Sequence, residues 1–193
     1  MVQLLGTERT MVDTDLRMTR QEYRSWVAAQ PNGRFERVDG AVLRMEREPL
    51  AHANRKALAW LALRNAVAAA GLQCHVYADG MTVEVGESDF EPDVVVHCRE
   101  RLPDDAIAVP DPLIILEVLR SGPCRVDTHE KLAAYFQLST LRHYLVFWAV
   151  ERRVVHFRRD GGGADIHTRI VTAGPIVLNP PGVTITVEEV YAG

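Results

Sequence analysis

The sequence contains few lysines and none of the motifs that mark several common enzyme classes. Only Lys56 and Lys131 are lysines among 22 basic residues, which leaves 20 arginines (22 − 2). Arginine almost everywhere, with lysine kept at two positions, indicates a need for an ammonium group there, although biased composition would give the same count. No GxGxxG, P-loop or GxSxG pattern occurs, which argues against dinucleotide, nucleoside-triphosphate and serine-hydrolase functions.

Cysteine and histidine are too scattered to indicate a zinc site. Cys74, Cys98 and Cys124 lack metal-ligand spacing, and no HExxH motif or His/Cys cluster supports a zinc hydrolase. Their odd number predicts reduced thiols and a cytoplasmic protein. No apolar run is long enough to cross a bilayer, and residues 1–20 lack the basic-then-apolar order of a secretory signal. We therefore expect no membrane partner.

Length and charge set the broad class. A chain of 193 residues with 47% hydrophobic and 25% charged residues is typical of one globular domain. We predict a flexible lead over residues 1–17 and a single domain over residues 18–193. The net charge of −4 gives no general attraction to nucleic acid, but it leaves room for a nuclease with a local basic groove.

Local signals predict a mixed α/β or α+β fold. Thr19 is a candidate cap for a helix over 20–30, and Asp39-Gly40 predicts a hairpin between two alternating segments, 34–38 and 41–45. An apolar helix is expected over 51–70, buried against a sheet and ended by Gly71. The other expected elements are strands over 72–77 paired with 81–85, strands over 93–98 and 113–119, a helix over 127–138, strands over 144–150 paired with 154–158, and strands over 165–172 and 183–187.

Two carboxylates stand in apolar runs of the kind that form buried strands. Glu117 lies near the end of the run 112–119, and Asp93 opens the run 93–96. Neighbouring strands would place the two acids side by side at one edge of the sheet, where carboxylate oxygens suit Mg²⁺. The structural alternatives are a strand-start hydrogen bond for Asp93, and an exposed strand end or a pair with Arg120 for Glu117.

Five more residues are candidates for the same site. Lys131, on the helix after Glu117, could orient or deprotonate a water or offset transition-state charge, or it could be a solvated lysine. Asp127 is best interpreted as a helix cap, and Glu36 as a solvated hairpin residue. His52 shares a helical face with Lys56, where both could contact phosphate or the metal, or simply lie in an exposed first turn.

The order of these residues resembles the bacterial Uma-type putative restriction endonuclease family, a branch of the PD-(D/E)XK nuclease superfamily. The resemblance covers about residues 18–190. The matching segments are Met18-Thr19, Phe35-Glu36-Arg37-Val38-Asp39-Gly40, His52, Glu91-Pro92-Asp93-Val94-Val95-Val96, Leu116-Glu117-Val118-Leu119, Asp127-Thr128-His129-Glu130-Lys131-Leu132 and Tyr135. It implies a PD-(D/E)XK nuclease-like mixed sheet flanked by helices, with an N-terminal β-hairpin.

The resemblance also implies an activity: Mg²⁺-dependent (or Mn²⁺-dependent) hydrolysis of DNA phosphodiesters. By position, Asp93 and Glu117 would be the metal-binding acids, and Lys131 the lysine that has moved from the strand, where Leu119 now stands, onto the helix. Glu36, His52 and Asp127 would be accessory. The sequence departs from the family where Arg120-Ser121-Gly122-Pro123 replaces a usual Ser-Pro-Ser. We expect a homodimeric DNA endonuclease, and the alternative is an inactive nuclease-fold protein that acts as a binding or assembly module.

Overall fold

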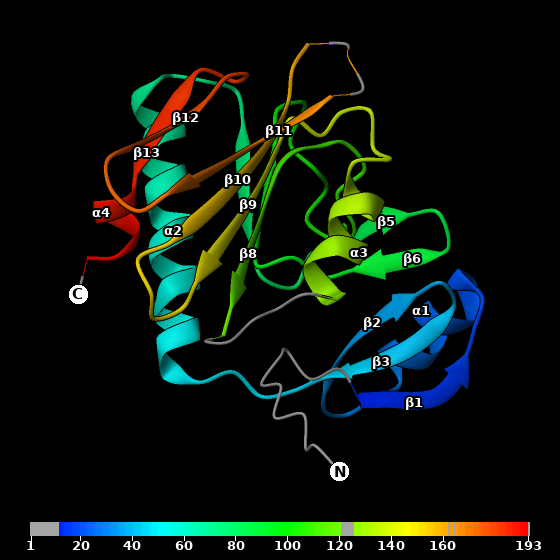
Figure 1. Cartoon of the computed structure of the whole chain (residues 1–193). Coiled ribbons are helices and arrows are strands. Elements are labelled where there is room, and N and C mark those ends of the chain that lie inside the picture. The colour runs from blue at the N-terminus through cyan, green and yellow to red at the C-terminus, as the bar shows by residue number, and fades with distance from the viewer. Residues whose placement is uncertain (1–11, 121–125, 162, 164, 193) are drawn as a thin grey trace.

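The computed structural model describes residues 12–120, 126–161, 163 and 165–192, without the side chains of 12–14 and 126–129. A six-stranded mixed sheet forms its centre, with helix α2 (Leu50–Ala69) on one face and helix α3 (Val126–Tyr135) on the other (Figure 1). A five-stranded sheet lies on the α3 side. None of the helices in these residues is long and apolar enough to cross a membrane. The predicted mixed sheet flanked by helices is confirmed.

The central sheet carries both predicted acids. Its strand order is β11-β10-β9-β8-β7-β4, and only β8 and β9 run parallel, joined by α3. A parallel pair needs such a crossover connection. The strands are β4 (His75–Ala78), β7 (Val94–His97), β8 (Pro112–Leu119), β9 (His143–Trp148), β10 (Val154–Arg159) and β11 (Ile166–Val171).

The second sheet contains the predicted hairpin. Its order is β1-β3-β2-β6-β5, with β1 (Val12–Arg17), β2 (Arg34–Val38), β3 (Ala41–Met45), β5 (Val83–Val85) and β6 (Ser88–Phe90). Asp39 and Gly40 both have positive φ, as a tight two-residue hairpin turn requires. Residues 12–17, which we predicted as part of a flexible lead, form β1 instead. Residues 1–11 lie outside the described part.

Two helices begin and end close to where the sequence predicted. Helix α1 (Arg20–Ala28) starts at Thr19, whose side chain forms a capping box with Glu22. Helix α2 is followed by Gly71 with φ +62°. Its buried face includes Ala59 and Leu63, while Leu61 on another face is 43% exposed. The helix is therefore covered on one side rather than on most sides.

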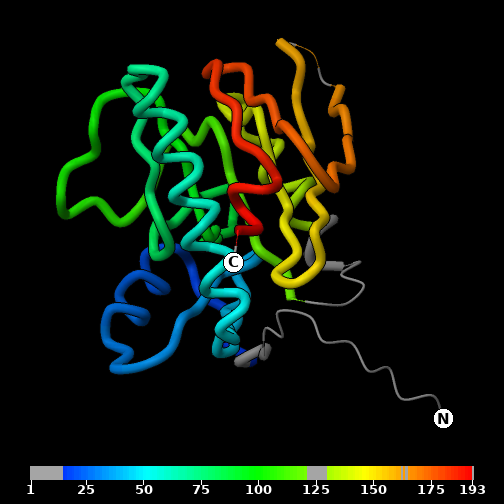
Figure 2. Tube along the Cα trace, turned by 90° about the vertical axis from the view of Figure 1, so that its left-hand side faces the viewer, coloured from blue at the N-terminus to red at the C-terminus, as the bar shows by residue number. Residues whose placement is uncertain are grey.

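The two faces of the central sheet have separate cores. Leu116 and Val118 pack toward α2, whereas Ile115 and Leu119 pack toward α3, because alternate residues of a strand face opposite sides. The α2 side is extended by the hairpin of β12 (Pro175–Leu178) and β13 (Val183–Thr186) and by α4 (Val187–Val190) (Figure 2). Of these three elements, the sequence predicted only β13.

One predicted strand pairing is wrong. We expected 72–77 to pair with 81–85, but β4 pairs with β7 and β5 pairs with β6. The turn around Asp79-Gly80 leads the chain from one sheet to the other rather than back along the same sheet. Local turn residues predict a change of direction, but the partner of a strand depends on the rest of the chain.

The prediction of reduced thiols is wrong for two of the three cysteines. Cys74 and Cys98 form a disulfide. His75 pairs with His97 across β4 and β7, which places the two cysteines opposite each other at the end of the strand pair. Sequence spacing could not show this, because the prediction had assigned the strand after Cys74 a different partner. Cys124 lies outside the described residues, and the cytoplasmic location stays a prediction.

Two buried histidines lie between β9 and β10. His143 Nε2 donates to the carbonyl of Pro180 at 2.8 Å, so His143 Nδ1 accepts from His156 Nε2 at 2.8 Å. Burial lowers the pKa of each ring to about 4, and for His156 the neighbouring His143 lowers it further. Both rings are therefore neutral at physiological pH.

This pair should make folding stability fall in mild acid. An unfolded histidine has a pKa near 6.5, so between about pH 6.5 and 4 the unfolded chain binds protons that the folded chain does not. Stability is therefore full above about pH 6.5, and about 2–4 kcal/mol should be lost by pH 5. Urea unfolding across this range measures the slope. His156→Gln should roughly halve it, whereas replacing the exposed His167 with glutamine should not, and an unchanged slope in His156→Gln would contradict the assignment.

Candidate active site

The register of β7 and β8 places Asp93 beside Glu117. Val94 pairs with Leu116 in this antiparallel pair, so the backbone of Asp93, one position before β7, lies beside that of Glu117. Both are 1% exposed. Asp93 Oδ2 accepts a hydrogen bond of 2.6 Å from the backbone N–H of Val118. The strand-start hydrogen bond is thus present in addition to the neighbouring acid.

Lys131 connects Glu117 to a second buried glutamate. Its Nζ donates to Glu117 Oε1 and to Glu36 Oε1, each at 3.0 Å, and all three residues are at most 3% exposed. Glu36 is held further by the backbone N–H of Glu91 at 2.9 Å. The prediction that Glu36 is solvated is wrong, because the hairpin carrying it packs against α3 and the central sheet. The prediction of a solvated Lys131 is likewise excluded.

Tyr135 belongs to this cluster and was given no role from the sequence. Its hydroxyl donates to Glu117 Oε1 at 2.9 Å, and its ring is fully buried. Burial, followed by the charges of Glu117 and Glu36, raises the pKa of Tyr135 well above its ordinary value, so it stays a donor. The usable signal was its spacing from Lys131, because residues i and i+4 of a helix share one face.

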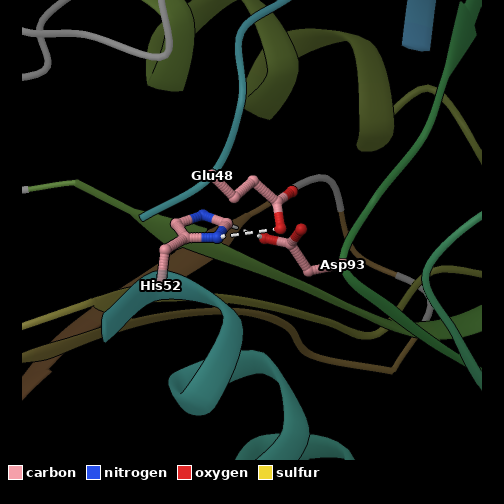
Figure 3. Close-up of side chains that lie close together, drawn as sticks. All are labelled: Glu48, His52 and Asp93. Atoms are coloured by element: carbon pink, nitrogen blue, oxygen red, sulfur yellow. Dashed lines mark ion pairs between the residues drawn. The ribbon is translucent and has the colours of Figure 1, made fainter. Parts of the chain in front are cut away.

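A second group of charged residues lies on the α2 side of Asp93. Glu48, just before α2, and His52, in its first turn, face Asp93 (Figure 3). His52 Nδ1 is 3.5 Å from Glu48 Oε2, and His52 Nε2 is 3.9 Å from Asp93 Oδ2. The sequence singled out His52 and Lys56 but missed Glu48, although positions 48, 52 and 56 repeat every four residues.

Lys56 and Arg34 bind the acids of this group. Lys56 Nζ is 2.5 Å from Glu48, 2.8 Å from Asp79 and 3.7 Å from Asp93. Burial favours the neutral amine, but the hydrogen bonds that Lys56 donates to Asp79 and Glu48 outweigh it and raise the pKa of Lys56. For Glu48, burial would raise the pKa, but the hydrogen bond and positive charge of Lys56 outweigh it and hold the pKa well below the ordinary value. Both lysines of the chain are therefore buried against carboxylates.

Two predicted candidates lie elsewhere. Arg120 does not bind Glu117, because its guanidinium donates to Glu46 Oε2 at 3.0 Å and to the carbonyl of Arg47. Asp127 falls in the first turn of α3, but its side chain is outside the described part, so its capping role stays a prediction.

Next to the Arg120 contacts, a cavity of about 530 Å³ is lined by Arg34, Arg44, Arg47 and neighbouring residues.

The site contains donor atoms of the kind that bind a divalent cation, and the described residues whose ligand atoms lie within 4.8 Å of one another are Glu48, His52 and Asp93. Asp93, Glu117 and Glu36 offer carboxylate oxygens, the ligands that Mg²⁺ prefers. Glu36 Oε2 is buried and has no hydrogen-bond partner in the described part of the chain, so it has unused capacity to accept. A buried acceptor without a partner is costly unless a ligand satisfies it. These residues could therefore hold a metal ion or bind a water attached to one.

The mixed sheet with its buried acids and lysine defines the class as a restriction endonuclease-like fold. A family model for Uma2, described as putative restriction endonuclease, matches residues 20–190, and the chain belongs to this family. The fold is similar to the crystal structure of a putative nuclease belonging to DUF820 from Anabaena variabilis, with TM-score 0.68, 12% identity, and coverage of 91% of this chain and 98% of that chain. No curated protein matches the sequence.

Proposed function

We propose that this protein is a metal-dependent DNA endonuclease that hydrolyses phosphodiester bonds with Mg²⁺ or Mn²⁺. The observation that carries the proposal is the pairing of β7 with β8, which supports a shared role for Asp93 and Glu117, together with Lys131 bound to Glu117 at 3.0 Å. Family membership supports a nuclease activity. Buried acids that share an ammonium group are typical of functional sites.

Asp93 and Glu117 would hold the metal ion, and Glu36 would serve as an accessory acceptor. When bound, such an ion polarises the phosphate and promotes attack by water. Glu117 is oriented from two sides, by Lys131 Nζ and by the Tyr135 hydroxyl. Asp93 is fixed by the backbone of Val118. The residues that would meet the metal are thus held in place before it binds.

Lys131 would act on the phosphate or on the attacking water. Its ammonium lies between Glu36 and Glu117, two carboxylates that favour the charged form. A buried ammonium can offset charge that develops on the phosphate oxygens, and transfer of its proton to a carboxylate would leave an amine able to accept one from water. Its place on a packed helix keeps the group within reach of Glu117.

The DNA backbone would lie along the arginines near Glu48. Arg44 and Arg47 are exposed and line the cavity of about 530 Å³ with Arg34, Glu46 and Glu48, so arginines outnumber acids there although the net charge of the chain is −4. Phosphate contacts from arginine provide affinity without sequence specificity.

Residues 18–193 would act as one domain, since the site takes side chains from both sheets. Two copies would cut the two strands, in keeping with the predicted homodimer.

Cleavage of supercoiled plasmid tests the proposal. The purified protein should nick or linearise plasmid with Mg²⁺ or Mn²⁺ and lose this activity in EDTA. Glu100→Ala, which removes an exposed acid, should cleave like wild type and so controls for the loss of a surface charge. If the wild type cuts neither double- nor single-stranded DNA with either metal, the proposal is wrong and the inactive binding-module alternative takes its place.

A further inference from the structure

We propose that Glu48, His52 and Asp93 form a second cation site, which takes a nitrogen-tolerant divalent metal such as Mn²⁺. The inference deepens the proposed function, because Asp93 would be shared between this site and the pair formed with Glu117. The second site lies toward α2, whereas Glu117 faces α3. No cysteine takes part in it.

The three side chains are arranged as metal ligands would be. One ligand atom from each lies within 4.8 Å of the other two, and the imidazole faces both carboxylates (Figure 3). His52 Nδ1 and Glu48 Oε2 are 3.5 Å apart. Two ligands bound to one ion at about 2.1 Å typically lie about 3–4 Å apart. The observed separation is therefore suitable for an ion between them.

The histidine has an unused nitrogen directed at this position. His52 Nε2 is in hydrogen-bond contact with the carbonyl of Val118, which only accepts, so Nε2 carries the proton. In this tautomer, Nδ1 carries a lone pair instead of a proton. It is buried and has no hydrogen-bond partner in the described residues, while the residue as a whole is 1% exposed. A lone pair facing the Glu48 carboxylate needs a cation or a proton between the two.

The surrounding charge also leaves room for a cation. Among the described residues, the carboxylates of Glu48, Asp79, Glu91 and Asp93 lie around Arg34 and Lys56, so the acids in this set outnumber these two cations. A divalent ion would balance this charge in a region that is largely shielded from water.

The donor set distinguishes this site from its neighbour. Imidazole is a good ligand for transition metals, whereas oxygen-only sites favour Mg²⁺. Glu117 and Glu36 offer oxygen alone, so only an ion held by His52 would have a nitrogen ligand here. A cavity of about 290 Å³ lined by Ala53, Lys56, Trp60 and Asp93 reaches one of the three ligands, Asp93.

Pulsed electron paramagnetic resonance with Mn²⁺ tests the site, because a coordinated imidazole gives a nitrogen coupling that carboxylates cannot. The full-length wild type at saturating Mn²⁺ should show this coupling. His52→Gln, which keeps a donor for the Val118 carbonyl, should lose it, and Glu48→Gln should weaken the associated Mn²⁺ affinity about tenfold. A wild type without nitrogen coupling, or a His52→Gln variant that retains it, would overturn the proposal.

Two further variants make the result specific. Glu117→Gln should keep the nitrogen coupling, because it alters only the neighbouring oxygen site, and loss of the coupling would contradict two separable sites. Lys56→Met removes the amine that competes with an ion for Glu48 and Asp93, so it should tighten Mn²⁺ binding by at least about threefold. Weaker binding in folded Lys56→Met would oppose the inference. Nitrogen coupling without DNA cleavage would refute the endonuclease proposal alone, and cleavage without nitrogen coupling would refute this site alone.

Discussion

Replacing Glu117 with glutamine should remove metal-dependent DNA cleavage without unfolding the protein. Glutamine keeps the size of the side chain and an oxygen that can accept from the Tyr135 hydroxyl, but it removes the charge that would hold the metal. We expect the cleavage rate to fall at least about a hundredfold, the scale typical of lost transition-state stabilisation. Mn²⁺ affinity at the oxygen site should weaken at least about tenfold, or about 1.4 kcal/mol.

The stability of this variant separates a functional acid from a structural one. Glu36 and Glu117 share the single positive charge of Lys131, so three buried groups carry a net charge of −1. Glutamine at 117 leaves Glu36 and Lys131 as a balanced pair, and the metal-free variant should melt at the same temperature as wild type or higher. A lower melting temperature with unchanged cleavage per folded molecule would show that Glu117 has only a structural role.

Lys131→Met should have the other large effect and reduce both activity and stability. We expect single-turnover cleavage with excess Mg²⁺ to slow by about a hundredfold or more. The change also leaves Glu36 and Glu117 buried without their cation, and breaking a buried pair in this way typically costs about 3–5 kcal/mol. Added Mg²⁺ should recover part of the lost stability, because an ion would replace the missing charge.

Two controls separate the charge of Lys131 from its chemistry. The double variant Glu36→Gln/Lys131→Met restores the net charge of −1, so it should regain stability but not activity. Lys131→Arg keeps a charge that cannot be lost near neutral pH, and it presents a planar group in place of a compact ammonium. Partial activity in Lys131→Arg would assign a charge contact, and none would assign proton transfer or strict geometry. Cleavage by Lys131→Met at the wild-type rate would exclude any chemical role.

Local sequence determined the hairpin, the capped helix α1, the end of α2 and the run that forms β8. Each depends on neighbours along the chain: the turn at Asp39-Gly40, the capping box at Thr19, or the apolar pattern that ends in Glu117. The pairing of the two strands that follow Asp93 and contain Glu117 was also predictable, because they are consecutive core strands joined by the loop 98–111. Residue types and order were therefore enough to indicate the acids, the lysine and the family.

Only the tertiary structure decided which other residues lie beside these acids and this lysine. Glu36 alternates with polar neighbours and looks solvated, but another sheet and α3 cover it, and Lys131 then lies 95 positions away in sequence and 3.0 Å away in space. The Cys74–Cys98 disulfide and the separation of β4 from β5 likewise depend on which strands pair. Strand pairing and burial are set by the free energy of packing the whole chain, which no local window of sequence contains.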